Sequence, residues 1–395
     1  MTEHVFADAP QQKVVITSSD LDQEELELVR SVVSWDQPND WKDLIFGAQG
    51  RAIFFKSPTR ESTLEDLVNG NYDGLQIIGA GGNLIYVNYG VISLPATVSI
   101  NPPDRTNHAS ELRHIVELRE VNDLGLFEFS HREYVPLHGM DANEAQNRKT
   151  FSAFLNSALA SYRQQNYRFP FVVPKLAAEG NFPEILDAQG NPLHFQVYRV
   201  PRLNRLPGQA MGHLKDSGDF TSMVNFFGEA SYLMGCTLRN FHYFDLAYMD
   251  GHPGNLSLIA ANGKTTLYTT DLGSMKNVSQ KKFPARYQAL DVYQYIITSY
   301  KTISDLLDYA LKGVPHAADL IGSPAIKEVA RRTFEGYLYP EIKSEFFTRP
   351  DVHELSRVFL DYSFEGGMQP FAEAFEKFGL MKTAVCFQLK GQPKQ

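Results

Sequence analysis

Cysteine is scarce in this chain: only Cys236 and Cys386 occur among 395 residues. Two cysteines cannot build a disulfide framework or a cysteine-ligated metal site, which agrees with a reducing compartment, so the cytoplasm is the expected location. Long apolar runs are missing as well. No run approaches the roughly 18 residues needed to cross a bilayer, and the first residues lack the basic and apolar regions of a signal peptide. The sequence therefore predicts neither a membrane span nor export.

Positive charge is also in short supply. The formal net charge is -9 and the sequence pI is about 5.7. A broad nucleic-acid surface needs clustered Lys and Arg to meet the phosphate backbone, so we expect no nucleic-acid partner, although a local basic pocket for a nucleotide is compatible with this charge. With 43% hydrophobic residues the chain can bury a sizeable core, as one two-lobed unit or as two domains.

Three polar residues flank a predicted β-hairpin in the second half of the chain. Asp250 and Asn255 lie in the stretch Tyr-Met-Asp-Gly-His-Pro-Gly-Asn that precedes the hairpin, and Asp271 opens Asp-Leu-Gly directly after it. The Asn262-Gly263 pair is a strong signal for the turn between the two strands. Loops at the same end of a hairpin can bring two carboxylates and an amide to one divalent ion, which is the equipment of phosphoryl transfer.

The spacing of these residues resembles the protein-kinase-like superfamily. Asp250 stands five residues before Asn255, as in the kinase catalytic loop, and Asp-Leu-Gly stands where Asp-Phe-Gly is expected. The sequence His-Pro-Gly-Asn is similar to that of the same loop in the atypical branch, the aminoglycoside-phosphotransferase-like and ABC1-like kinases. The resemblance extends over about residues 75–300 and is most specific at 250–273.

This resemblance implies an α+β, two-lobed fold with a β-rich N-lobe and a helical C-lobe. The expected divisions are an N-terminal extension over 1–70, an N-lobe over 71–205 and a C-lobe over 206–395. It implies ATP and Mg²⁺ as cofactors, with Asn255 and Asp271 on the metal. Asp250 would orient a hydroxyl acceptor and take part in its deprotonation.

A glycine cluster in the first half of the chain is similar to the kinase glycine-rich loop. Gly79, Gly81 and Gly82 follow a β-rich run, and glycine lets backbone N–H groups approach phosphate oxygens. The match is partial, because Leu84 stands where a third spaced glycine belongs. The cluster is expected to cover the phosphates, with a plain hairpin turn as the alternative.

The lysine that kinases carry on the next strand is not found. The strand expected over 96–101 ends in Asn101, which cannot replace a cation. Arg105 is one substitute, paired with a glutamate of a helix expected over 110–120. Lys56, on an earlier apolar strand preceded by Gly47 and Gly50, is another, and the sequence does not decide between them. The helix glutamate is one of three residues, Glu111, Glu117 and Glu120.

Other segments follow the expected order of elements. Helices are predicted over 20–33, 142–163 and 220–239, and a β-meander over 169–174, 183–192 and 194–201, whose last strand leads to a hinge near 198–202. A helix from about 286 carries Asp291 near its start, where the family has an aspartate that braces the catalytic loop from below. Helical segments continue over 301–380.

Three more residues of the central stretch are polar or aromatic and lie close to Asp250 in sequence. Asp245 is a competing carboxylate but lacks the five-residue interval to Asn255. Tyr248 stands where the kinase loop has histidine, so the support of the loop is expected to differ. His252 is predicted to hold the loop through a hydrogen bond rather than to act in catalysis.

The expected activity is transfer of the γ-phosphoryl group of ATP to a hydroxyl of a small molecule or protein. The missing lysine leaves two alternatives: a pseudokinase that binds nucleotide or a partner without turnover, and a kinase-fold enzyme performing nucleotidyl transfer or a ligase-like activation. The acceptor and the oligomeric state cannot be read from the sequence.

Overall fold

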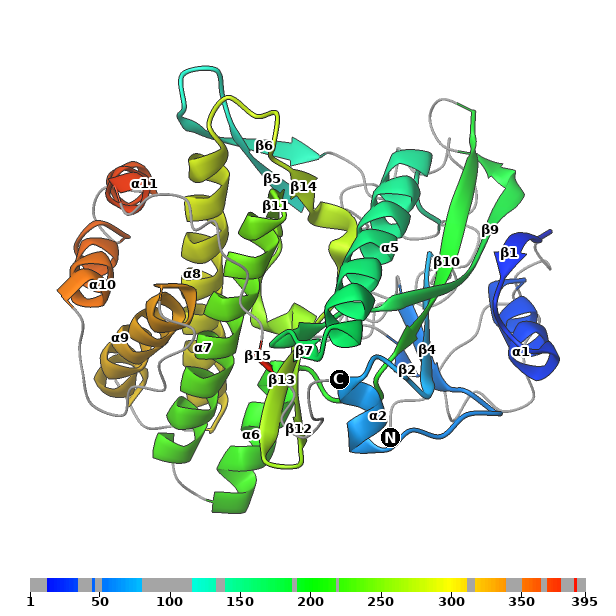
Figure 1. The fold of residues 1–395 in the computed structure, drawn as a ribbon, viewed down its shortest axis with the longest axis horizontal. Helices are drawn as coiled ribbons and strands as arrows, with labels where there is room; N and C mark the ends of the chain where they lie inside the picture. Colours follow the sequence, from blue (N-terminus) through cyan, green and yellow to red (C-terminus); the bar gives the residue numbers. More distant parts are fainter. Residues whose placement is uncertain are drawn as a thin grey trace. The chain divides into compact units, whose positions relative to one another are not determined.

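A computed structural model describes most of the chain, and its residues separate into two compact units. The described residues are 13–34, 45–46, 52–79, 116–132, 139–186, 190–217, 220–310, 317–338, 350–363, 368–377 and 387–388. Unit 1 takes residues 1–118, 131–154 and 174–202, and unit 2 takes 119–130, 155–173 and 203–395. Figure 1 shows mixed helices and strands, with the strands of unit 1 drawn from blue to green.

Unit 1 is built on a six-stranded antiparallel sheet with the order β1-β9-β10-β4-β3-β2. Its strands are β1 (Val15–Ser19), β2 (Ile45–Phe46), β3 (Ala52–Lys56), β4 (Gly74–Ile78), β9 (Lys175–Leu186) and β10 (Pro192–Val200). Helix α2 (Leu64–Val68) lies between β3 and β4 in sequence, and α5 (Ala142–Gln164) precedes β9. The expected helix over 142–163 is therefore confirmed.

Helix α1 (Gln23–Val33) packs its apolar face on this sheet. Val29, Val32 and Val33 are completely buried in one core cluster with residues of β3, β4, β9 and β10. The helix begins with a capping box, in which Asp22 and Glu25 each accept a hydrogen bond from the other's backbone N–H. The sequence signal Ser-Ser-Asp-Leu-Asp-Gln-Glu-Glu thus starts a helix as predicted.

The prediction that residues 1–70 form a separate N-terminal extension is wrong. Strands β1, β2 and β3 come from this segment and are hydrogen-bonded into the same sheet as β4, β9 and β10. The reason is apolar burial: Ile53 and Phe55 of β3 are 3% and 4% exposed, in the same cluster as Leu75 and Ile77 of β4. The boundary expected at 205 lies close to the observed one at 202.

The prediction of a helix over 110–120 is wrong for residues 116–120, the part that the structure describes. Residues 116–121 form strand β5 (Val116–Val121), which pairs with β6 (Phe127–Arg132), so Glu117 lies on a strand. The turn between them explains the difference. The Asn122 side-chain oxygen accepts the backbone N–H groups of Leu124 and Leu126, and Gly125 takes φ +77°. This local turn chemistry folds the chain back and favours strands over a helix.

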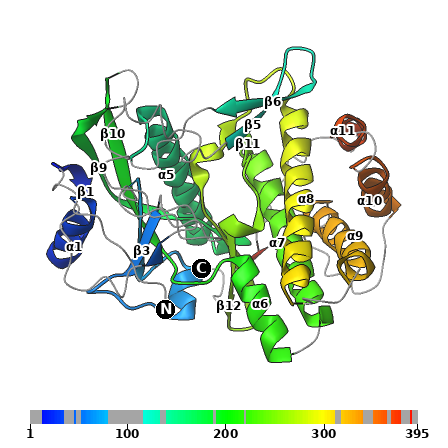
Figure 2. The ribbon, with the colours of Figure 1, turned by 180° about the vertical axis from the view of Figure 1, so that it is seen from behind.

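Unit 2 is dominated by helices packed around α7 (Phe220–Tyr243) and α8 (Pro284–Ala310). The others are α6 (Leu206–Ser217), α9 (Ala317–Leu338), α10 (Pro350–Ser363) and α11 (Met368–Lys377). α7 and α9 cross so closely that a Cβ on Gly235 would overlap the Thr333 carbonyl, and one on Gly336 would overlap the Tyr232 carbonyl. Figures 1 and 2 show α9 beside α7 and α8 from opposite sides.

Short strands complete unit 2. The predicted hairpin is present as β12 (Leu256–Ala261) and β13 (Lys264–Thr269), with Asn262 and Gly263 both at positive φ as a tight turn requires. β8 (Phe171–Val172) pairs in parallel with β13, so this strand does not belong to the expected β-meander. Two further pairs are β11 (Leu246–Ala247) with β14 (Lys276–Asn277), and β7 (Tyr167–Arg168) with β15 (Phe387–Gln388). In the part of the chain that the structure describes, no helix is long and apolar enough to cross a bilayer.

Candidate catalytic and metal loops

The stretch 248–255 lies between β11 and β12 and is anchored from below by helix α8. Both carboxylate oxygens of Asp291 accept backbone hydrogen bonds from the loop, from Tyr248 at 2.5 Å and from Met249 at 2.5 Å. Asp291 is 1% exposed, so these bonds are shielded from water. The expectation that this aspartate braces the loop is confirmed.

Two residues of other helices hold Asp291 in turn. The Nε2 atom of His242, on α7, lies 3.2 Å from the Asp291 carboxylate. The Nδ1 atom of His242 lies 2.8 Å from the hydroxyl of Tyr337, on α9. Three helices therefore share one buried polar chain that ends on the loop, which fixes the loop more rigidly than packing alone would.

Within the loop, Asp250 and Asn255 contact each other directly. The Asn255 amide donates to the Asp250 carboxylate at 2.9 Å and to the Asp250 carbonyl at 3.2 Å. Both side chains are half-buried. Because the amide nitrogen is used in these bonds, the amide oxygen of Asn255 is the atom that remains for a cation. The five-residue interval thus places the two side chains together, as predicted.

His252 supports the turn between Asp250 and Asn255. Its Nδ1 atom accepts the Gly254 backbone N–H at 3.1 Å and so caps the short 3-10 helix Pro253–Asn255. Its Nε2 atom lies 3.7 Å from the Asp250 carboxylate. The predicted loop-holding hydrogen bond of His252 is therefore observed.

Asp271 begins the second loop in a left-handed conformation, with φ 57° and ψ 57°. The peptide before it is held on both sides: the Thr270 N–H donates to the Asn255 carbonyl at 3.0 Å, and the Thr270 carbonyl accepts the Tyr248 hydroxyl. These two bonds join the segment before Asp271 to the segment that carries Asp250 and Asn255. The hairpin between them brings its two ends together, as the spacing predicted.

Charges on both loops act on the Tyr248 hydroxyl. Complete burial is the largest cause that raises the pKa of its hydroxyl, and the negative charges of Asp250 and Asp271 raise it further. Arg205 acts in the opposite direction. One phenol therefore lies close enough to both carboxylates to feel each of them.

The oxygen donors of this region fit a small hard cation. They are the carboxylates of Asp250 and Asp271 and the amide oxygen of Asn255, with no sulfur or imidazole among them. No group of three or more His, Cys, Asp or Glu residues with metal-site geometry occurs among the described residues. Mg²⁺ is usually bound by one or two carboxylates and keeps water and phosphate oxygens in its remaining positions. A set with so few carboxylates therefore suits Mg²⁺ and does not form a cage made of protein ligands alone.

Asp245, the competing carboxylate, does not join this set. It is exposed, at φ 57°, and its carbonyl accepts the Val278 N–H at 2.8 Å. Its backbone thus serves the connection between α7, β11 and β14. The residue has a structural reason for its place in the sequence.

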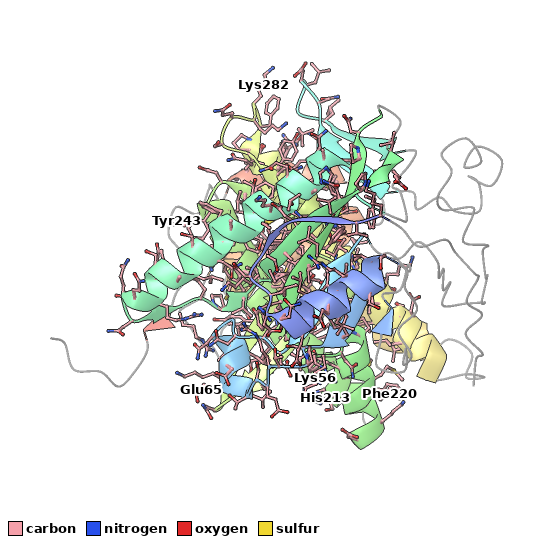
Figure 3. The ribbon with its side chains drawn as sticks, turned by 90° about the vertical axis from the view of Figure 1, so that its right-hand side faces the viewer. Lys56, Glu65, His213, Phe220, Tyr243 and Lys282 are labelled. Carbon is pink, nitrogen blue, oxygen red and sulfur yellow. The ribbon has the colours of Figure 1, made fainter. Side chains whose placement is uncertain are left out.

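The sequence-predicted residues of unit 1 have mixed outcomes. Gly79 ends β4 at φ +91°, and a Cβ there would lie 2.8 Å from the His194 carbonyl, so close backbone packing requires glycine. Lys56 (Figure 3) forms an ion pair with Glu61 at 3.1 Å, and its side chain is 44% exposed. Gly81, Gly82, Asn101, Arg105, Glu111 and the hydrogen-bonding surroundings of Glu117 and Glu120 lie outside what the structure describes.

Sequence reasoning missed three supporting residues: His242, Thr270 and Tyr337. His242 and Tyr337 lie far from the loops in sequence and read as members of apolar helices. Thr270 acts through its backbone, which no side-chain pattern reveals. A usable signal existed only for His242, a histidine on the apolar face of a helix that leads into the loop.

Comparisons with known proteins add little to this geometry. No protein-family model matches the chain, and no curated protein sequence matches it. Among solved structures, the chain is similar to one described as "WaaP in complex with acyl carrier protein", with 11% sequence identity over 71% of this chain and 98% of that chain and a TM-score of 0.32. At that score the likeness carries no argument, so the site rests on its own residues.

Proposed function

We propose that the protein is an ATP-dependent phosphotransferase of the protein-kinase-like class. Asn255 and Asp271 would hold Mg²⁺, and Asp250 would orient the acceptor hydroxyl. The observation that carries the proposal is the union of the two loops: Asp250 and Asn255 are bonded to each other, and the Asn255 carbonyl is bonded to the residue before Asp271.

The metal supplies charge neutralisation on the transferred phosphate when it is bound. The chain's own residues do the rest. Asp271 offers a carboxylate from a rigid left-handed turn, and Asn255 offers its amide oxygen while its nitrogen stays on Asp250. Positioning of this kind is the main protein contribution to phosphoryl transfer, because the reaction demands little covalent chemistry from the protein.

Asp250 is suited to its role by its partners. One carboxylate oxygen accepts from Asn255 at 2.9 Å, and the other lies 3.7 Å from the His252 ring. A carboxylate fixed in this way, with about a quarter of its side chain exposed, can accept the proton of an incoming hydroxyl as that oxygen attacks the γ-phosphorus. The bond to the β-phosphate oxygen breaks, and ADP leaves with the electron pair.

The sequence has Asn101 where kinases carry the phosphate-binding lysine, and Lys56 on β3 is paired with Glu61. This favours, as the second candidate, a nucleotide-binding module without turnover. Nucleotide binding is part of the proposal under either candidate, whereas an acceptor belongs only to the phosphotransferase.

Product analysis tests the proposal. Purified protein is incubated with Mg²⁺ and ATP, with and without a panel of small hydroxyl compounds and proteins, and the nucleotide products are separated. If the protein is a kinase, the wild type should release ADP, and both Asp271→Asn and Asp250→Asn should abolish that release. The thermal shift caused by Mg²⁺ and ATP should be lost only in Asp271→Asn. Release of AMP would instead show nucleotidyl transfer or ligase-like activation, and a thermal shift without turnover would show the binding module. No response of the wild-type protein to ATP in any of these assays would contradict the proposal.

A further inference from the structure

The turn between β5 and β6 carries two exposed leucines. Leu124 is 79% exposed, the highest value among the large apolar side chains that the structure describes, and Leu126 is 45% exposed. The turn has a fixed shape, because the Asn122 side-chain oxygen accepts the backbone N–H groups of Leu124 and Leu126 at 2.9 and 3.0 Å. Both leucines are therefore presented to solvent by backbone that is already ordered, which lowers the entropy cost of binding through them.

This turn packs against residues 276–283, the segment that leads from β14 into α8, and both belong to unit 2. A Cβ on Gly125 would lie 3.4 Å from the Phe283 ring. The Tyr287 hydroxyl accepts the Val121 N–H at 3.4 Å, and the two side chains share one apolar cluster. Figures 1 and 2 show the two loops side by side from opposite directions. The turn and the segment thus form one surface.

Three lysines of the 276–283 segment surround the turn. The Nζ atom of Lys282 donates to the Asp123 backbone carbonyl at 2.9 Å, directly beside the leucines, and Figure 3 shows this side chain extending outward. The Nζ atoms of Lys276 and Lys281 lie 5.9 and 5.8 Å from the centre of the Tyr287 ring. These contacts bring three ammonium groups to the base of the turn, while the leucines stand at its end.

Positive charge is therefore concentrated here in a chain whose formal net charge is -9. The acidic residues of the adjoining described segments are Asp123 and Asp245, whose carbonyl accepts the Val278 N–H at 2.8 Å. The three lysines outnumber them. Like charges that are held close together repel one another, and an anionic partner relieves that repulsion. The surface thus fits a partner that combines negative charge with an apolar layer.

We propose that Leu124, Leu126, Lys276, Lys281 and Lys282 form a docking surface for a lipid bilayer with anionic headgroups. The leucines enter the boundary between headgroups and acyl chains, and the lysines contact the headgroup phosphates and carboxylates. Two leucines are too little apolar surface for a specific protein interface, which buries about 800 Å² on each partner. A bilayer needs less, because a few inserted apolar side chains and a basic patch act together, and a fluid surface closes around a convex turn.

Cosedimentation of the full chain with vesicles of phosphatidylcholine, with and without phosphatidylserine, tests the proposal. The wild type should bind only the vesicles that contain phosphatidylserine, and added salt should weaken this binding because it screens the lysines. Lys281→Gln and Lys282→Gln should each weaken binding about fivefold. Leu124→Ser should weaken it about tenfold, because the leucine side chain leaves water when it inserts.

Matched controls carry the same changes on other elements. Leu64 on α2 is 53% exposed, and Lys327 on α9 is exposed, so Leu64→Ser and Lys327→Gln should bind the vesicles as the wild type does. An equal loss of binding in these controls would overturn the assignment of the surface. Absence of wild-type binding to any vesicle would overturn the proposal, and so would retention on immobilised polyglutamate alone, which would show an acidic protein partner instead.

Fluorescence tests insertion of the turn directly. Leu124→Trp keeps the turn apolar, and phosphatidylserine vesicles with brominated acyl chains should quench its added indole more than they quench the wild type, whose tryptophans are Trp35 and Trp41. Quenching equal to that of the wild type would show that the turn does not enter the bilayer and would overturn the proposal. These assays contain no ATP, so their failure leaves the proposed phosphotransferase activity intact, and a protein without that activity can still dock.

Discussion

Replacement of Asp291 by asparagine tests the brace beneath the catalytic loop with almost no change in volume. In the wild type, one carboxylate oxygen accepts the Tyr248 N–H at 2.5 Å, and the other accepts the Met249 N–H at 2.5 Å. Asparagine keeps one acceptor oxygen and puts an NH₂ group in place of the other. One backbone donor then faces another donor in a buried place.

The size of the effect follows from this pairing. A buried donor left without an acceptor costs about 1–3 kcal/mol, and bonds to a charged acceptor lie at the upper end of that range. Asp291→Asn should therefore lower the free energy of unfolding by about 2–3 kcal/mol. Asp291→Ala leaves both backbone N–H groups and the His242 ring without the carboxylate, so its loss should be about 4–6 kcal/mol.

Urea denaturation at neutral pH measures these losses, and hydrogen exchange locates them. The midpoint should fall with an unchanged m value, and amides of residues 246–255 should exchange faster. Asp305→Asn is the matched control, because Asp305 is exposed on the same helix and its replacement should change stability by less than about 0.5 kcal/mol. An unfolding free energy of Asp291→Asn equal to that of the control would refute the brace.

Two further predictions concern stability away from the site. Glu25 is completely buried, and its carboxylate accepts from Ser57 at 2.5 Å and from Arg199 at 2.8 and 2.7 Å. Burial works to raise the pKa of this carboxyl, but the hydrogen bonds and charge of Arg199 and the bond from Ser57 outweigh it and leave the pKa below its ordinary 4.5. The stability that this carboxylate contributes is therefore present above pH 4.5 and is lost as the pH falls through the folded-state pKa. Glu25→Gln should lower the free energy of unfolding by about 3–5 kcal/mol at pH 7, and the variant should lose less stability than the wild type on acidification below pH 5. An acid profile of the variant equal to that of the wild type would contradict this. Gly235→Ala should destabilise unit 2 by about 2 kcal/mol or more, because its Cβ meets the Thr333 carbonyl in the α7–α9 crossing, whereas Gly212→Ala, with open space around the added Cβ, should be neutral or slightly stabilising in the same thermal melts.

Much of unit 2 was predictable because its signals are local. The Asn262-Gly263 pair predicted the hairpin, and the apolar spacing of 220–239 predicted α7. The interval from Asp250 to Asn255 predicted that these side chains lie together, and they are hydrogen-bonded at 2.9 Å. Each of these rests on residues within a few positions of one another. Local backbone geometry decides them before the rest of the chain is considered.

Unit 1 was harder to predict because its sheet is assembled from distant segments. β1 pairs with β9 across more than 150 residues, and no pattern within residues 1–70 states that partner. The same limit applies to the support of the site. Tyr337 and His242 reach Asp291 from separate helices, and only the packed fold reveals that they form one chain with it.

The strand β5 shows how a turn can override a helical pattern. The segment before residue 121 has charged and apolar residues at spacings compatible with a helix, yet the Asn122 side chain and Gly125 close a tight turn that commits the flanking residues to strands. The Asn-Asp-Leu-Gly sequence was the signal, and turn chemistry of this kind outweighs weak periodicity.

We propose that Asn255 and Asp271 form one metal-binding site for a nucleotide, with Asp250 beside it. Crystals grown with Mn²⁺ and ADP test it most directly, because the anomalous signal of manganese locates the ion without reference to any model of the reaction. We predict a peak at about 2.1–2.2 Å from the Asn255 amide oxygen and an Asp271 carboxylate oxygen, with a nucleotide phosphate as a further ligand. A manganese ion bound with ADP at other residues, with these two side chains left unoccupied, would contradict the account.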